Sequence, residues 1–171
     1  QQYFGRFNSM LKTDSEFHME GRNKRPPSDP INAVLSYLYG ILAKEVFVTL
    51  NSVGFDPYLG FYHRPRYGKP ALALDLMEEF RPIIADSTAI TLFNNGEVKK
   101  IDFVDIGAGV SMRKEAKRTM IRGYERRMNT EIIHPLFEYR ITYRRVLEVQ
   151  ARLLARHVQG EVREYTSFCT R

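Results

Sequence analysis

The sequence predicts a mainly α-helical domain, and three observations support this fold class. Hydrophobic residues make up 43% of the 171 residues, a fraction that argues against a disordered chain. They recur mostly at the three- and four-residue spacing of amphipathic helices, and strand-like runs are few. No run approaches about 18 consecutive apolar residues, so we expect no membrane span. The length suits a single helical domain over residues 1–171.

The first predicted helix begins in the middle of its apolar pattern. Tyr3, Phe4 and Phe7 already follow helical spacing, and no capping residue precedes them. We therefore expect that the first turns of this helix, and an upstream domain, lie outside this sequence. The alternative is that the start of this sequence was chosen poorly and cuts into the helix.

The second predicted helix has a clear start and a clear end. Asp29 is an N-cap residue, and Pro30 occupies the first helical position, where a missing N–H does no harm. Gly54 ends the helix. The apolar face of this helix consists of Ile31, Val34, Leu35, Leu38, Ile41, Leu42 and Val46.

A polar stripe follows the same helix beside its apolar face. Asn32, Ser36 and Tyr39 stand at positions i, i+4 and i+7 and therefore share one side. Two interpretations are equally open. The stripe lines a cleft together with His63, or it forms a hydrogen-bonded seam between two helices.

The remaining elements are also predicted to be helical. Pro70 opens a helix that should kink at Pro82, because proline cannot donate a hydrogen bond to the preceding turn. Asn94–Gly96 is a turn. Long helices rich in arginine and lysine are expected over 111–129 and 138–158.

Positive charge is concentrated in the last third of the chain. Residues 111–171, which we treat as a basic helical part, carry a net charge of +7, whereas residues 1–110 carry −1. This asymmetry favours a polyanionic partner, most simply double-stranded DNA, over basic faces that are merely solvated. The side chains expected to contact DNA are Arg22, Arg25, Asn32, Ser36, Arg64, Arg66, Lys69, Lys114, Arg118, Arg122, Arg145, Arg152 and Arg156.

The single cysteine, Cys169, excludes an internal disulfide framework and a cysteine-based zinc site. One free cysteine is also typical of the reducing cytosol, so we expect a cytoplasmic protein.

A candidate metal site lies around His63. Asp75 and Glu78 are three residues apart and project from one face of the helix that follows Pro70, and His63 comes from the loop before it. One imidazole nitrogen with carboxylate oxygens suits Mn²⁺ or Mg²⁺, which could hold a phosphate and activate a nucleophile. The alternative is a solvated acidic helix face with His63 bonded to a backbone carbonyl. The apolar neighbours of Asp75 favour a metal or a buried salt bridge.

Four sequence blocks carry a resemblance to a known family. They are RNKRPPSDPINAVLS (22–36), Tyr39-Gly40, GFDPYLGFYH (54–63) and LALDLMEEFRPIIAD (72–86). In this order and spacing the chain resembles the CRISPR-associated integrase of spacer acquisition, a metal-dependent DNA endonuclease. The resemblance implies the helical C-terminal catalytic domain of that enzyme, without its small N-terminal β domain.

The resemblance also implies roles for individual residues. It places the metal-binding residues of the family on His63 and Glu78, with Asp75 as a neighbouring active-site acid. It further implies that Tyr39 is the active-site tyrosine and Lys69 the lysine of the loop.

One expected ligand has no counterpart in this sequence. The family has a metal-binding glutamate in a Glu-Gly pair upstream of a Tyr-Phe that matches Tyr3-Phe4. Glu20-Gly21 imitates this pair but lies directly against the RPP loop, so we interpret it as a chance match. We therefore expect this chain alone to be inactive, with its three predicted ligands still clustered.

By resemblance, the intact enzyme joins the 3′-hydroxyls of short DNA to the repeat of a CRISPR array by transesterification. It is implied to act as a homodimer together with a second, small adaptation protein. Two alternatives remain: a non-catalytic helical module whose basic helices hold a DNA backbone, and a related transposon-borne integrase.

Overall fold

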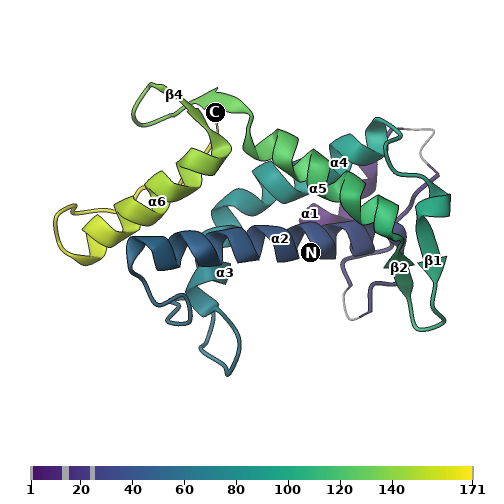
Figure 1. Cartoon of the computed structure of the whole chain (residues 1–171), viewed down its shortest axis with the longest axis horizontal. Coiled ribbons are helices and arrows are strands. Elements are labelled where there is room, and N and C mark those ends of the chain that lie inside the picture. The colour runs from purple at the N-terminus through teal and green to yellow at the C-terminus, as the bar shows by residue number, and fades with distance from the viewer. Residues whose placement is uncertain (1, 13–15, 24–25, 171) are drawn as a thin grey trace. The chain divides into compact units, whose positions relative to one another are not determined.

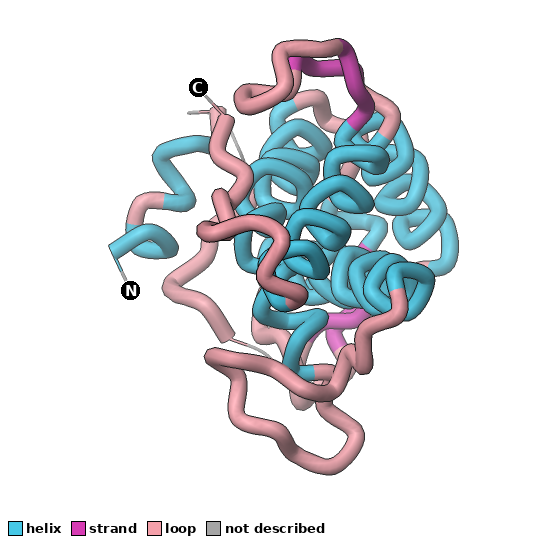
Figure 2. Tube along the Cα trace, turned by 90° about the vertical axis from the view of Figure 1, so that its left-hand side faces the viewer, coloured by secondary structure: helices cyan, strands magenta, loops and turns pink. Residues whose placement is uncertain are grey.

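A computed structural model describes residues 2–12, 16–23 and 26–170. The fold is mainly helical, as predicted, with few strands (Figures 1 and 2). The helices are α1 (Gln2–Gly5), α2 (Pro30–Val53), α3 (Ala71–Phe80), α4 (Ser87–Asn94), α5 (Lys114–Met128) and α6 (Tyr143–Val158). The strands are β1 (Phe103–Asp105), β2 (Val110–Met112), β3 (Glu131–Ile133) and β4 (Arg140–Thr142).

The chain folds into two compact units. Unit 1 comprises Gln1–Gly40 and Ala85–Glu125, and unit 2 comprises Ile41–Ile84 and Arg126–Arg171. The sequence predicted one domain with a basic part at 111–171. The structure instead divides that basic part between the units after Glu125.

Helix α2 confirms the predicted start and end. The Asp29 Oδ1 atom accepts the Asn32 amide at 2.8 Å, so Asp29 is the cap. Gly54 adopts a φ of +101°, a conformation that ends a helix and favours glycine. The fully buried apolar residues of α2 are Ile31, Val34, Leu35, Leu38, Leu42, Val46 and Leu50.

Helix α2 is also long and apolar enough to cross a membrane by length and composition, with a mean hydropathy of 1.5 over its best window. This is weak evidence for a span, since the core helix of a soluble protein has the same properties. The buried apolar face of α2 fits a core helix.

The regular α-helix ends just before Pro82, where the sequence predicts a kink. Between α3 and α4, residues Arg81–Asp86 form a π-helical turn. Pro82 has no N–H to donate to the carbonyl of Glu78, and the widened turn accommodates that missing bond. The turn after α4 is confirmed, with Gly96 at a φ of +64°.

Three predicted helix boundaries are wrong. The first helix ends at Gly5, and Phe7–Met10 forms a separate 3₁₀ turn. Residues 111–112 belong to β2, which pairs antiparallel with β1, so the helix starts only at Lys114. Residues 140–142 form β4, which pairs with β3. Helical spacing cannot reveal these short strands, because their stability comes from a partner elsewhere in the chain.

A half-buried carboxylate fixes α3 within unit 2. Glu79 accepts the Tyr165 hydroxyl at 2.6 Å, the Phe168 amide at 2.9 Å and the Gln150 side-chain amide at 3.1 Å. These bonds hold α3 to α6 and to the C-terminal segment. Helix α3 also carries Asp75 and Glu78, so the hydrogen bonds of Glu79 help to hold the candidate site in place.

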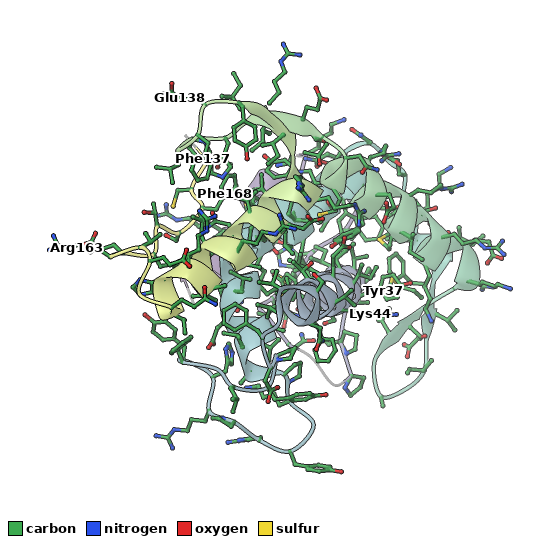
Figure 3. The ribbon with its side chains drawn as sticks, turned by 60° about the vertical axis from the view of Figure 1, so that its left-hand side comes forward. Tyr37, Lys44, Phe137, Glu138, Arg163 and Phe168 are labelled. Atoms are coloured by element: carbon green, nitrogen blue, oxygen red, sulfur yellow. The ribbon has the colours of Figure 1, made fainter. Side chains whose placement is uncertain are left out.

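Unit 2 contains a buried histidine without a charge partner. His134 is 2% exposed and packs against Phe137 and Phe168, with ring centroids 4.8 and 5.7 Å away. Figure 3 labels the two phenylalanines. Its Nδ1 accepts the Leu136 and Phe137 amides, so the proton is on Nε2. Within the described part of the chain Nε2 has no hydrogen-bond partner. Burial lowers the pKa of His134.

The stability of the chain should therefore fall as the pH drops below about 6.5, the ordinary histidine pKa. Below this pH the unfolded state binds a proton on His134 that the folded state excludes. The free energy of unfolding should therefore fall by up to about 1.4 kcal/mol per pH unit. Urea denaturation between pH 5 and 8 should show this loss in the parent chain and a flatter profile for His134→Phe. The exposed His18→Gln is the control and should keep the parent profile. Identical profiles for the parent and His134→Phe would contradict the assignment.

Candidate active site

The loop before α3 lies unusually close to the start of that helix. A Cβ atom on Gly60 would stand 2.7 Å from Ala71 and 2.8 Å from the Asp75 Oδ2 atom, so only glycine fits. The Leu72 amide donates to the Pro57 carbonyl at 2.9 Å. The loop is therefore held on α3 immediately before it reaches His63.

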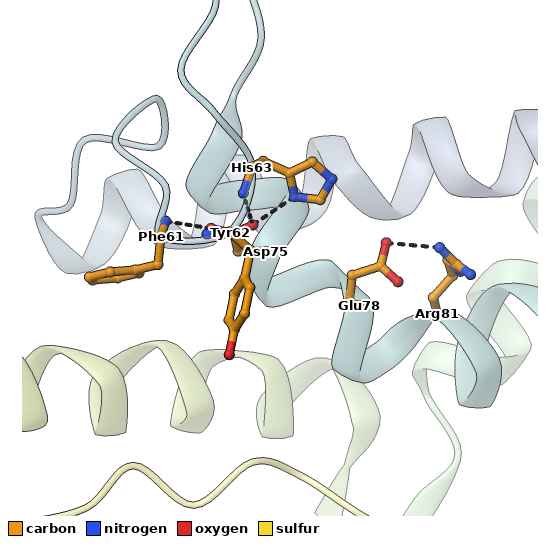
Figure 4. A network of polar contacts seen from close by, with 6 residues as sticks. All are labelled: Phe61, Tyr62, His63, Asp75, Glu78 and Arg81. Atoms are coloured by element: carbon orange, nitrogen blue, oxygen red, sulfur yellow. Dashed lines mark hydrogen bonds and ion pairs between the residues drawn. The ribbon is translucent and has the colours of Figure 1, made fainter.

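Asp75 binds this loop through four hydrogen bonds (Figure 4). Its Oδ2 accepts the amides of Phe61 and Tyr62 at 2.6 and 3.0 Å. Its Oδ1 accepts the His63 amide at 2.9 Å and the His63 Nδ1 at 2.6 Å. The Asp75 side chain is only 8% exposed, so these donors replace its hydration.

The charge on Asp75 decides that Nδ1 of His63 is a hydrogen-bond donor. Burial alone would raise the pKa of Asp75, but the hydrogen bonds from Tyr62, His63 and Phe61 together lower it. An ionised carboxylate can only accept, so the Nδ1 of His63 carries the proton and donates it to Asp75. Nε2 is then the ring nitrogen of His63 left for a metal, on a side chain that is 32% exposed. Metal-binding histidines are commonly oriented in this way.

The expectation that His63, Asp75 and Glu78 form one cluster of ligands is wrong. No three histidine, cysteine or acidic side chains are grouped to hold a metal in residues 2–12, 16–23 and 26–170. Both Asp75 oxygens accept hydrogen bonds from the loop, so in this structure Asp75 orients His63. Glu78 is 46% exposed and pairs with Arg81 at 2.8 Å. Glu20 is exposed and belongs to no such group either.

The polar stripe of α2 lies in unit 1 and binds Arg22. The Arg22 guanidinium donates to the Asn32 Oδ1 at 2.7 Å and to the Ser36 Oγ at 3.0 Å. It also lies over the Tyr39 ring, 5.3 Å from the ring centroid. The prediction that Asn32 contacts DNA is wrong, because Asn32 is fully buried and its amide donates to Asp29 and to the Gly21 carbonyl.

Asp86 is a buried acid beside Tyr39 that the sequence interpretation missed. It is 1% exposed, and its two oxygens accept the hydroxyls of Tyr39 at 2.5 Å and Tyr3 at 2.8 Å. Its place after the buried Ile84 and Ala85 was an available signal, since an acid in such a setting needs partners. Around Tyr39 these contacts favour the hydrogen-bonded seam, and the shared cleft with His63 stays a prediction.

Replacing Tyr39 with Phe should therefore cost about 1 kcal/mol or more of stability, because the buried Asp86 loses a donor. Urea denaturation of the two chains measures this difference. The control is Tyr37→Phe, two residues away on α2 (Figure 3), whose hydroxyl makes no hydrogen bond to the described residues. Tyr37→Phe should change the free energy of unfolding by no more than about 0.5 kcal/mol. Equal effects at both positions would contradict the seam.

The structure places most of the predicted DNA-contacting cations at the surface. Arg64 and Arg66 are exposed on the loop before α3, and Lys69 is half-buried at its end. Arg145 pairs with Glu148, and Arg156 lies 3.7 Å from Glu161. Arg25 lies outside the described residues. On the two basic helices, all six predicted contacts are exposed: Lys114, Arg118, Arg122, Arg145, Arg152 and Arg156.

Comparison with known proteins gives consistent matches. The sequence profile of the family described as CRISPR associated protein Cas1 matches residues 1–126. The chain is 53% identical, over 99% of its length, to a CRISPR-associated exonuclease Cas4/endonuclease Cas1 fusion of Geobacter sulfurreducens, covering 31% of that protein. It is 46% identical over the same share to the CRISPR-associated endonuclease Cas1 3 of Thermus thermophilus, covering 50% of it.

Solved structures are similar as well. A casposase bound to its integration product superimposes with a TM-score of 0.85 at 25% identity, over 95% of this chain and 46% of that one. A partial Cas6-RT-Cas1–Cas2 complex gives 0.80 at 29% identity, over 98% of this chain and 49% of that one. The chain thus spans about a third to a half of the length of these relatives.

Proposed function

Because the chain belongs to the Cas1 family of CRISPR-associated proteins, we propose that it is the catalytic part of a metal-dependent DNA endonuclease and integrase. The observation that carries this proposal is the Asp75 carboxylate, 8% exposed, which binds Nδ1 of His63 and leaves Nε2 as the nitrogen for a metal. The proposed reaction is the insertion of short DNA into a CRISPR array by transesterification, in the cytoplasm.

His63 and Glu78 would hold Mn²⁺ or Mg²⁺. The metal would polarise the scissile phosphate and stabilise the charge that develops on it. Glu78 is free to take this part because its pair with Arg81 is exposed and contributes little to stability. Asp75 orients the His63 ring by accepting the hydrogen bond from its Nδ1. The family resemblance assigns a further glutamate ligand to a position before the first residue of this sequence.

The proposed partners are double-stranded DNA and a small second adaptation protein. Similarity to a Cas1–Cas2 complex and to a casposase bound to its integration product supports both. A homodimer of the intact enzyme is also part of this proposal.

The exposed face of α5 provides a direct test of DNA binding. Lys114, Arg118 and Arg122 stand at i, i+4 and i+8 and are all exposed. Replacing Arg118 and Arg122 with Ala should reduce the slope of log affinity against log salt by about 1.8 for duplex DNA, if each contacts one phosphate. Lys99→Ala with Lys100→Ala removes the same charge from unit 1 elsewhere and should leave the slope unchanged. An unaltered slope in the α5 variant would refute the contact.

Strand transfer by the intact enzyme tests the catalytic proposal. With Mn²⁺, a plasmid carrying a CRISPR repeat and a short duplex, the enzyme should yield joined DNA. His63→Ala should reduce that yield at least about 100-fold, and the exposed His18→Ala should not. A non-catalytic module would bind DNA and give no product with any of these proteins.

The casposase similarity favours one second candidate, a transposon-borne integrase. The two candidates differ in target. Preference for repeat DNA over unrelated plasmid sequence supports the CRISPR integrase, and integration without regard to the repeat supports the transposon enzyme.

A further inference from the structure

The C-terminal segment of the chain holds the end of α3. After α6 the chain turns back, and residues 165–170 have no regular secondary structure (Figure 1). The Tyr165 hydroxyl and the Phe168 amide donate to the Glu79 carboxylate at 2.6 and 2.9 Å. The Phe168 ring also stacks on Phe80, with ring centroids 5.8 Å apart and an angle of 7° between the planes. We call Glu79, Tyr165 and Phe168, together with Gln150 of α6, which donates to Glu79 at 3.1 Å, the C-terminal clasp.

The clasp holds the two residues that directly follow Glu78, a candidate metal ligand. Successive residues of an α-helix are about 100° apart, so Glu78 and Glu79 point to different sides of α3. Glu78 is 46% exposed, whereas the oxygens of Glu79 accept the three hydrogen bonds of the clasp. Nearer its start, α3 is held by the Asp75 carboxylate, which binds the loop of His63. The stretch of α3 that carries Asp75 and Glu78 is therefore held from both ends.

The C-terminal segment is attached at few points. Of residues 165–170, only Phe168 is buried, and the residues on either side of it are exposed. Two cavities of about 620 and 170 Å³ flank Phe168, and His134 and Pro135 line both of them as well. Irregular backbone with few buried contacts is typical of segments that open locally while the rest of a domain stays folded. The clasp is therefore a contact that opens and closes without global unfolding.

We propose that Glu79 is a positioning residue of the metal site, and that closing of the C-terminal clasp and binding of the metal favour each other. The inference rests on the proposed function, because it concerns the metal that His63 and Glu78 would hold. Glu79 acts by fixing the backbone next to Glu78 and not as a ligand, since its oxygens already accept three hydrogen bonds. Such coupling is reciprocal: a metal that binds the closed form more tightly stabilises the closed form by the same factor.

Strand transfer by the intact enzyme at increasing Mn²⁺ concentration tests the positioning role. Glu79→Ala removes the acceptor of the clasp and should raise the Mn²⁺ concentration for the half-maximal rate at least about tenfold. Glu79→Gln should raise it less than about threefold, because the amide oxygen still accepts the Phe168 amide and the NH₂ group can donate to the Tyr165 hydroxyl. The control Val46→Ala weakens the buried core of unit 2 outside the clasp and should keep the parent Mn²⁺ dependence.

Hydrogen exchange of the Phe168 amide reports the state of the clasp without any reaction, because this amide donates to Glu79. Mass spectrometry of residues 165–170 in the intact enzyme measures its rate. Saturating Mn²⁺ should slow the exchange at least about fivefold in the parent enzyme. Glu79→Ala should exchange rapidly with and without Mn²⁺. Glu78→Gln should lose the protection by Mn²⁺, because it removes a proposed ligand and leaves the clasp intact.

The outcomes separate this inference from the proposed function. An unchanged Mn²⁺ dependence in Glu79→Ala would make the clasp merely structural, and equal shifts in Glu79→Ala and Glu79→Gln would make Glu79 a ligand. A shift of the same size in Val46→Ala would trace the effect to general loss of stability. Each of these results overturns the inference and leaves the proposed function standing. If the parent enzyme joins no DNA at any Mn²⁺ concentration, the proposed function fails, and the exchange of the Phe168 amide still decides the inference: protection by Mn²⁺ supports it, and unaltered exchange refutes it.

Discussion

Replacing Asp75 with Asn should destabilise the chain by about 2–4 kcal/mol, although the two side chains have the same shape. Asp75 accepts three backbone amides and the His63 ring at 2.6 to 3.0 Å. An asparagine has only one side-chain oxygen. Its NH₂ group would face the two donors that bind the second oxygen of Asp75. Each donor left without a partner costs about 1–3 kcal/mol where it is buried. Urea denaturation at pH 7 measures the difference.

The pH dependence gives this prediction a specific signature. The pKa of Asp75 is lowered in the folded state, so its carboxylate stabilises the fold above the unfolded value of about 3.9. That contribution is lost as the pH falls below about 4. The gap between the parent and Asp75→Asn should therefore narrow in acid. A gap that stays constant from pH 7 to pH 3 would show that shape, and not charge, sets the effect.

Glu78→Gln is the matched control on the same helix. Glu78 is half-exposed, and among the described residues its only ion pair is with Arg81, three residues on. Exposed pairs of this kind contribute up to about 1 kcal/mol. The free energy of unfolding should therefore change by less than about 1 kcal/mol. If Glu78→Gln destabilised the chain as much as Asp75→Asn, the distinction between an orienting acid and a ligand would fail.

The fold was predictable wherever local chemistry decides it. Asp29-Pro30 and Gly54 mark the ends of α2 through capping and backbone conformation, and Pro82 interrupts its helix because it has no N–H. The strands β2 and β4 were not predictable in the same way. Each has three residues and depends on pairing with β1 or β3, so no spacing within the segment reveals it.

The candidate site was predictable in its residues and only in part in their roles. A three-residue spacing places Asp75 and Glu78 on one side of α3, but in the described chain they do not form a group of three possible metal ligands with His63. The difference arises from the close approach at Gly60, which brings three amides onto Asp75. Asp86 was missed because its partners, Tyr3 and Tyr39, lie 83 and 47 residues away in sequence.

Metal affinity is the second large effect that we expect. In this chain His63 and Glu78 are the two candidate ligands, and a catalytic Mn²⁺ or Mg²⁺ ordinarily needs several oxygen or nitrogen ligands. Mn²⁺ should therefore bind this chain weakly. A longer chain that includes the upstream glutamate implied by the resemblance should bind Mn²⁺ at least about 100-fold more tightly, since even an outer-shell partner contributes about 10–100-fold. Isothermal titration calorimetry measures both affinities.

Two variants of the longer chain decide which acids bind the metal. Glu78→Gln should lose most of the gained affinity at nearly unchanged stability, because it removes a charged oxygen ligand from an exposed position. Glu20→Gln should bind Mn²⁺ like the parent, because Glu20 joins no group of ligands in the described chain. Equal, tight binding by the short and the long chain, lost in Glu20→Gln, would show that Glu20 completes the site after all. The orienting role of Asp75 would survive that result, because it follows from its contacts with His63 alone.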